Sequence, residues 1–85
     1  MGTQKKEVDY SDLKKYPDRL YTPMEVSNRG WILDRNRNGN YSLVLKLIRV
    51  GHLNAENYSV GAKPMYQVKA SEIISYLKKY KGITV

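Results

Sequence analysis

Cysteine and phenylalanine are absent from this chain, and His52 is the one histidine. Without cysteine the chain can form no disulfide and no thiolate metal site, and thiol catalysis is excluded. A single histidine cannot supply several imidazole ligands to a metal. No apolar run approaches the roughly 18 residues that a membrane-spanning helix needs. We therefore expect a soluble, cytoplasmic protein with no metal ion, no cofactor and no membrane-spanning helix.

Acidic residues are scarce relative to basic ones. The 85 residues include 15 Lys and Arg but 8 Asp and Glu, which gives a formal net charge of +7. Residues 1–20 have a net charge of +1, so most of the excess belongs to residues 21–85. Such an excess favours an anionic partner, with nucleic acid the first candidate and a membrane surface the second. The length allows one small domain.

Two helices are predicted by their capping residues. Thr22, Pro23 and Glu25 form the pattern of a capping box with proline at the first helical position, and this helix weakens at Gly30. Residues 34–40 are all polar or glycine and predict a turn. Asn40 can cap a second helix over residues 41–50, which Gly51 would end.

The second predicted helix separates its polar and apolar residues. At about 100° per residue, Ser42, Lys46 and Arg49 share one narrow stripe. The opposite side holds a predicted core face made of Val44, Leu47 and Ile48. We therefore expect this helix to be covered on most sides and to show a basic stripe to its surroundings.

The remaining segments predict a β-hairpin and a third helix. Residues 56–60 and 65–68 read as two strands around a turn at 61–64, and a helix follows from about residue 70 to Gly82. We expect residues 1–20 to form a loosely packed, partly disordered extension with one short helical turn capped by Ser11. The predicted domain covers residues 21–82, and residues 83–85 form a tail.

Four motifs follow one another along the chain: Tyr21-Thr22-Pro23-Met24-Glu25-Val26, Ile48-Arg49-Val50-Gly51-His52-Leu53-Asn54-Ala55, Val60-Gly61 with Tyr66-Gln67-Val68, and Ser71-Glu72-Ile73-Ile74-Ser75-Tyr76-Leu77. In this order they resemble the MerR-like, excisionase type of winged helix-turn-helix. The resemblance covers about residues 20–80. It implies an α+β fold with a helix-turn-helix, a β-hairpin wing and a C-terminal helix. Residues 34–40 depart from the family, whose turn between the helices is shorter, and Tyr41-Ser42 stand where many members have arginine.

The predicted DNA contacts follow from the second helix and its surroundings. A recognition helix places its N-terminal residues at base edges, so we expect Tyr41, Ser42 and Lys46 there and Arg49 at a phosphate. Leu45 either touches a thymine methyl group or packs in the core. Arg35 and Arg37 are candidate phosphate contacts, and Lys63 is a candidate contact of a phosphate or of the minor groove. Ordinary solvent exposure is the alternative for all three.

We therefore expect a non-enzymatic protein that binds specific sequences of double-stranded DNA. The resemblance implies an excisionase, or recombination directionality factor, that bends DNA, self-associates on it and acts on an integrase or recombinase. A small transcriptional regulator of a mobile element is the alternative within DNA binding. From another class, a protein-interaction module could dock a partner on Leu43, Leu45 and Val50. No catalytic motif accompanies His52.

Overall fold

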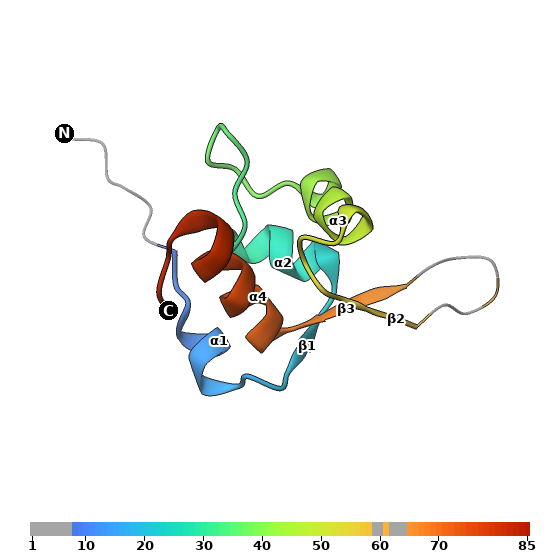
Figure 1. The fold of residues 1–85 in the computed structure, drawn as a ribbon, viewed down its shortest axis with the longest axis horizontal. Helices are drawn as coiled ribbons and strands as arrows, with labels where there is room; N and C mark the ends of the chain where they lie inside the picture. Colours follow the sequence, from blue (N-terminus) through green and yellow to red (C-terminus); the bar gives the residue numbers. More distant parts are fainter. Residues whose placement is uncertain (1–7, 59–60, 62–64) are drawn as a thin grey trace.

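Short helices and a small antiparallel sheet alternate along the chain, as the computed structural model shows for residues 8–58, 61 and 65–85 (Figure 1). This confirms the α+β class. The elements, in chain order, are α1 (Ser11–Lys15), β1 (Leu20–Tyr21), α2 (Pro23–Arg29), α3 (Tyr41–Val50), β2 (Glu56–Asn57), β3 (Tyr66–Lys69), α4 (Ala70–Tyr76) and the π-helical turn η1 (Leu77–Lys81).

The caps of α2 and α3 form as the sequence predicts. The Glu25 amide donates to Thr22 Oγ1 over 3.2 Å, and the Thr22 amide donates to Glu25 Oε1 over 3.1 Å, which completes the capping box. Asn40 Oδ1 accepts from the Leu43 amide over 3.1 Å at the start of α3. Both helices end at a glycine in the left-handed region, Gly30 and Gly51.

The apolar residues of α2 and of the loop that follows it differ in burial. Met24 is 51% exposed. Val26 is buried, whereas Trp31 and Ile32 are buried beyond the end of the helix rather than within it. Because Gly30 turns the chain, these two large side chains enter the core from the following loop.

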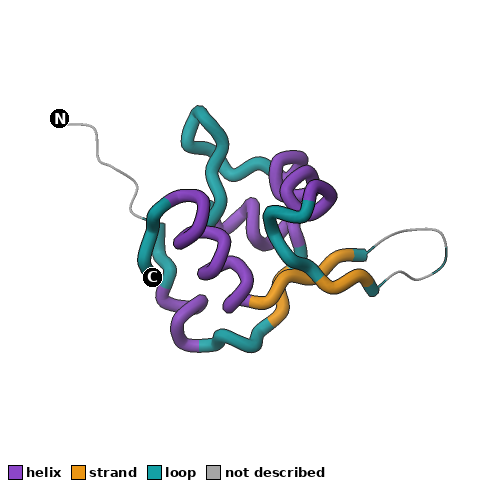
Figure 2. The backbone as a smooth tube through the Cα atoms, in the orientation of Figure 1, coloured by secondary structure: helices purple, strands orange, loops and turns teal. Residues whose placement is uncertain are grey.

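The sheet has β3 in its centre and β1 and β2 on either side (Figure 2). Glu56 pairs with Gln67 in the predicted antiparallel pairing of β2 with β3. The strand β1 was not predicted, and it pairs Leu20 with Lys69 on the other edge of β3. Residues 59–60 and 62–64, which include most of the predicted turn, lie outside the described residues.

The prediction of a loosely packed N-terminal extension is wrong for the part that the structure describes. Leu13 of α1 is completely buried in the core. Asp12 forms an ion pair of 2.8 Å with Arg29 of α2, and Trp31 Nε1 donates to the Asp9 carbonyl over 2.8 Å. Ser11 is the first residue of α1 rather than its cap, and its amide donates to the Asp9 carboxylate. These contacts join α1 to the body through one buried leucine and two polar anchors.

The core gathers side chains from nearly every element, and α4 lies across it (Figure 1). Tyr21 and Trp31 pack edge to face with their ring centroids 4.8 Å apart. The other buried apolar residues are Leu13, Val26, Ile32, Val44, Leu47, Leu53, Val68, Ala70, Ile73, Tyr76 and Leu77. Within the described ranges, no helix has the length and apolar character to cross a membrane.

Candidate nucleic-acid interface

The outer face of α3 presents the predicted basic stripe. Ser42, Lys46 and Arg49 are all exposed. On the opposite side, Val44 is completely buried and Leu47 is 9% exposed, so the helix is anchored by that side. The predicted core role of Ile48 is only partly right, because its side chain is half-buried at the margin of the core. The stripe is therefore held in place by a buried face that α2 covers.

The loop before α3 is organised by one carboxylate. Asp34 Oδ1 accepts from the amides of Asn36 and Asn38, and Asp34 Oδ2 accepts from Asn40 Nδ2 over 3.3 Å. The amide of Asn38 is the main cause that lowers the pKa of Asp34, and Asn40 and Asn36 act in the same direction. Since Asn40 also caps α3, this network connects the loop to the start of the helix.

The two predicted arginines of this loop point to its exposed side. Arg35 and Arg37 are both exposed, and Arg37 has a φ of 63°, in the left-handed region. A backbone bridge between Leu33 and Gly39 closes the loop at its base. The loop stands out beside α3 at the top of Figure 1. Both guanidinium groups are therefore displayed on the connection between α2 and α3.

Gly39 fixes where this loop meets α2. A Cβ atom at position 39 would fall far inside contact distance of the Ser27 carbonyl oxygen, so the backbone of the loop lies directly against the C-terminal turn of α2. Ser27 is itself buried, and its hydroxyl donates to the Met24 carbonyl over 2.8 Å. The longer turn that departs from the excisionase pattern thus remains packed on the body at its base.

Among the described residues, the cations of α3 and of its loop have neither a carboxylate nor an aromatic partner, as is also true of Lys14, Lys69, Lys78 and Lys81. Arg29 pairs with Asp12, and three cations lie over aromatic rings: Lys15, Arg19 and Lys79. In the part of the chain that the structure describes, no carboxylate lies within ion-pair distance of Arg35, Arg37, Lys46 or Arg49. Residues 35–55 contain no Asp or Glu at all. These four cations are therefore available to an external anion.

A groove runs beside the basic stripe between α2, α3 and β3. Its open volume is about 320 Å³, and it is lined by Thr22, Pro23, Met24, Tyr41, Leu45, Arg49, Met65 and Tyr66. Tyr41 is 42% exposed, and Met24 and Met65 are 51% and 50% exposed. Sequence reasoning identified Tyr41, Leu45 and Arg49 but missed the two methionines. The alternation around Met65 indicated a strand, but the position of that strand beside α3 is a tertiary property.

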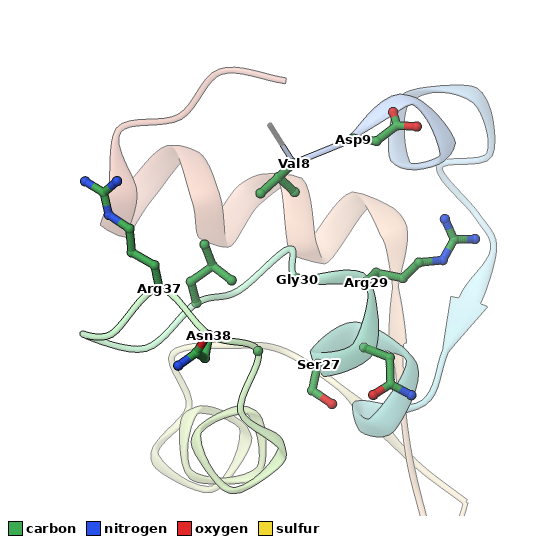
Figure 3. A pocket seen from close by; sticks show the side chains of 10 residues that line it. Val8, Asp9, Ser27, Arg29, Gly30, Arg37 and Asn38 are labelled. Carbon is green, nitrogen blue, oxygen red and sulfur yellow. The ribbon is translucent and has the colours of Figure 1, made fainter. Parts of the chain in front are cut away.

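A second hollow lies elsewhere among the described residues and offers little chemistry (Figure 3). It measures about 680 Å³ and is bordered by Val8, Gly30 and Leu33 with several polar residues. Arg29 and Arg37 stand on opposite sides of it (Figure 3), but Arg29 is paired with Asp12. The Asp9 carboxylate beside it already accepts from Ser11, which is the main cause that lowers the pKa of Asp9. We find no nucleophile with an activating base here.

His52 and Lys63 complete the predicted residues. His52 follows α3 and stacks on Tyr80, with ring centroids 4.9 Å apart. Lys63 lies outside the described residues. Within the described ranges, no three His, Cys, Asp or Glu side chains gather as metal ligands would.

Comparisons of the chain with protein-family models, with curated proteins and with solved structures find no match.

Proposed function

We propose that this chain binds double-stranded DNA through the outer face of α3. One observation carries the proposal: Lys46 and Arg49 are exposed on the same face as Ser42, without a carboxylate partner in the described part of the chain. The opposite face of the helix is buried, so the exposed face is presented in a fixed orientation. A helix is about 10–12 Å across with its side chains, which fits the major groove of B-DNA at about 12 Å.

The surroundings of α3 support a winged helix-turn-helix arrangement. The helix α2 packs against α3, and the paired strands β2 and β3 follow directly in the chain. In such an arrangement α3 enters the major groove with Tyr41 and Ser42 nearest the base edges, while α2 lies across the sugar-phosphate backbone of the DNA. Arg35 and Arg37 then contact phosphates from the connecting loop, and Lys63, which lies outside the described residues, is the further candidate for a contact with the DNA backbone or the minor groove.

The finer biological role follows from the sequence motifs alone. We propose an excisionase-like protein that binds adjacent sites, bends the duplex and directs an integrase or recombinase. A transcriptional regulator of a mobile element uses the same DNA-binding surface. Selection of bound sites from a random duplex library, followed by footprinting, separates the two. Tandem repeats of one motif support cooperative architectural binding, and a palindrome supports a symmetric dimeric regulator.

The binding proposal is tested by the salt dependence of duplex affinity. We expect a random duplex to bind at low salt, with log K falling linearly against log salt by about 0.9 for each phosphate contacted. Fluorescence anisotropy with a labelled duplex measures this slope. Negligible binding at low salt would overturn the proposal and favour the protein-interaction module, for which Leu43, Leu45 and the 54% exposed Val50 form the docking surface.

A matched pair of double variants separates the stripe from general surface charge. Lys46→Ala with Arg49→Ala removes two charges from α3, and Lys78→Ala with Lys79→Ala removes two from η1. All four side chains are exposed, so both variants should fold, and circular dichroism checks this. We expect the α3 variant to lower the salt slope by up to about two units while the η1 variant retains it. Equal losses would mean that α3 has no special part in binding.

A further inference from the structure

The groove beside α3 combines exposed apolar groups with one charge of the basic stripe. Seven large apolar side chains are exposed among the described residues, and three of them border this one groove: Met24, Tyr41 and Met65. Leu45 lies half-buried in its wall. Arg49 lines the groove and also belongs to the stripe with Ser42 and Lys46. A ligand that reaches Arg49 therefore also covers the apolar groups.

The residues that line the groove favour a polyanion as that ligand. None of them is acidic, and Arg49 is the one charged residue among them. A protein partner would find apolar surface here but would also bury Arg49, which then needs a carboxylate from the partner. DNA supplies an anion for Arg49 at its backbone and keeps this group at the solvated rim.

The major groove of DNA presents one apolar feature to such a surface. Thymine has a C5-methyl group there, whereas cytosine at the same position has none unless it is methylated. We propose that the groove of Met24, Tyr41, Leu45 and Met65 receives pyrimidine C5-methyl groups of DNA bound along α3. This inference rests on the proposed DNA binding and adds a preference for thymine or 5-methylcytosine at the bases nearest the start of the helix.

The positions of the four side chains suit this role. Tyr41 is the first residue of α3 and Leu45 lies one turn further along the same side, so both belong to the half of the helix that approaches base edges. Met24 comes from the first turn of α2, and Met65 immediately precedes β3. Methionine side chains are unbranched and polarisable, and they adapt to irregular apolar shapes. The side chains of Met24 and Met65 can therefore adjust to pack against the C5-methyl group of a base that lies beside α3.

Replacement of thymine by deoxyuridine tests the inference, because it removes the methyl group and keeps every hydrogen-bonding atom. The probes are a short alternating adenine–thymine duplex and its deoxyuridine counterpart, with an alternating guanine–cytosine duplex and its 5-methylcytosine counterpart as a second pair. We expect loss of thymine methyl groups to weaken binding about fourfold for each group covered. A gain with 5-methylcytosine extends the preference to methylated DNA, and no gain assigns it to thymine.

Variants of the groove show whether the methyl effect arises there. Met24→Ala removes an exposed side chain and should not affect folding, and Leu45→Ala provides a second reading. Val50→Ala is the control, because Val50 is equally exposed on α3 but does not line the groove. We expect both groove variants to abolish the difference between thymine and deoxyuridine and the control to keep it. Equal affinity of the wild type for both members of each pair overturns the inference while DNA binding stands. Failure to bind any duplex overturns the proposed function itself.

Discussion

The helices α3 and α4 are alike on their inner sides and differ on their outer sides. Val44 and Leu47 of α3 and Ile73 of α4 are buried in the same core. The helix α3 ends at Gly51 and the segment formed by α4 and η1 ends at Gly82, and both glycines lie in the left-handed region. On the outer side, α4 continues into η1, where Lys79 lies over the ring of Tyr80. On α3, Arg49 instead lines a groove whose described lining residues include no Asp or Glu. Local surroundings, rather than the count of basic residues, distinguish a candidate binding face from ordinary surface charge.

The two helices also begin differently. The first turn of α3 is capped by the Asn40 side chain. The first turn of α4 has no side-chain cap; the amides of Ala70 and Ser71 donate instead to the carbonyls of Arg19 and Pro17 over 2.9 and 3.0 Å. The start of α3 therefore depends on the preceding loop, whereas the start of α4 is held by the segment that leads into β1.

Truncation of the inner faces should have the largest effect and should affect both helices alike. We expect Leu47→Ala and Ile73→Ala each to lower the free energy of unfolding by about 2–5 kcal/mol, because each empties a core site. Urea denaturation measures the change. Ile48→Ala should cost less than Leu47→Ala, since Ile48 is only half-buried. Equal costs at positions 47 and 48 would show that the inner face of α3 is broader than the structure indicates.

Changes on the outer face of α3 should alter which DNA sequence is preferred. If Tyr41, Ser42 and Lys46 contact bases, each truncation should cost about 1–3 kcal/mol on the preferred site and less on random duplex. Arg49→Ala should weaken all duplexes alike, with a salt slope lower by about one unit. Competition binding with site variants measures both effects. If truncation at all four positions lowered the affinity for every duplex equally, binding would depend on charge attraction alone.

Loss of the cap should affect α3 but not α4. We expect Asn40→Ala to lower the free energy of unfolding by about 1 kcal/mol, because it leaves the Leu43 amide without its acceptor. Lys69→Ala is the matched control, since Lys69 precedes α4 without capping it by a side chain. Thermal melting compares the two variants. An equal shift in the control would contradict the difference between the two helix starts.

Acid should weaken the hydrogen bonds at the start of α3 before those at the start of α4. Of the four predicted changes, this one should alter the free energy of unfolding the least. The lowered pKa of Asp34 means that its ionised form stabilises the folded loop. This contribution is complete above the ordinary carboxyl pKa and is lost as the pH falls through the lower value of the folded state. Amide hydrogen exchange of Asn36 and Asn38 measures it. Asp34→Asn should remove the pH dependence, and its persistence in that variant would assign the effect to another group.

Local signals predicted the helices of the candidate site well. The capping box at Thr22, the cap at Asn40 and the stop at Gly51 involve residues at most four positions from the groups they affect. The exposed stripe followed from the spacing of Ser42, Lys46 and Arg49 for the same reason. Ile48 shows the limit of this reasoning. Spacing identifies which side of a helix is apolar, but the neighbouring elements decide how far round the helix burial extends.

The parts that sequence reasoning missed depend on distant partners. The strand β1 has two residues, too few for an alternating pattern, and it pairs with Lys69 and Val68 far along the chain. The five residues of α1 are likewise too few to show a helical apolar period, so the burial of Leu13 was not visible. Met24 and Met65 line the same groove, although all of α3 and β2 lies between them in the sequence.

The contact of Gly39 with α2 divides the connecting loop into two parts with different freedom to vary. At the base, any side chain at position 39 would have to displace the Ser27 carbonyl, so the chain cannot be altered there without moving the end of α2. Beyond it, Arg35 and Asn36 are exposed at the tip. Added length at the tip costs little closure entropy, but it would separate the Asn36 and Asn38 amides from Asp34 and move Arg35 and Arg37. A change at the tip therefore acts on the Asp34 network and on the proposed phosphate contacts, whereas a change at the base also moves the end of α2, so the base must keep its glycine.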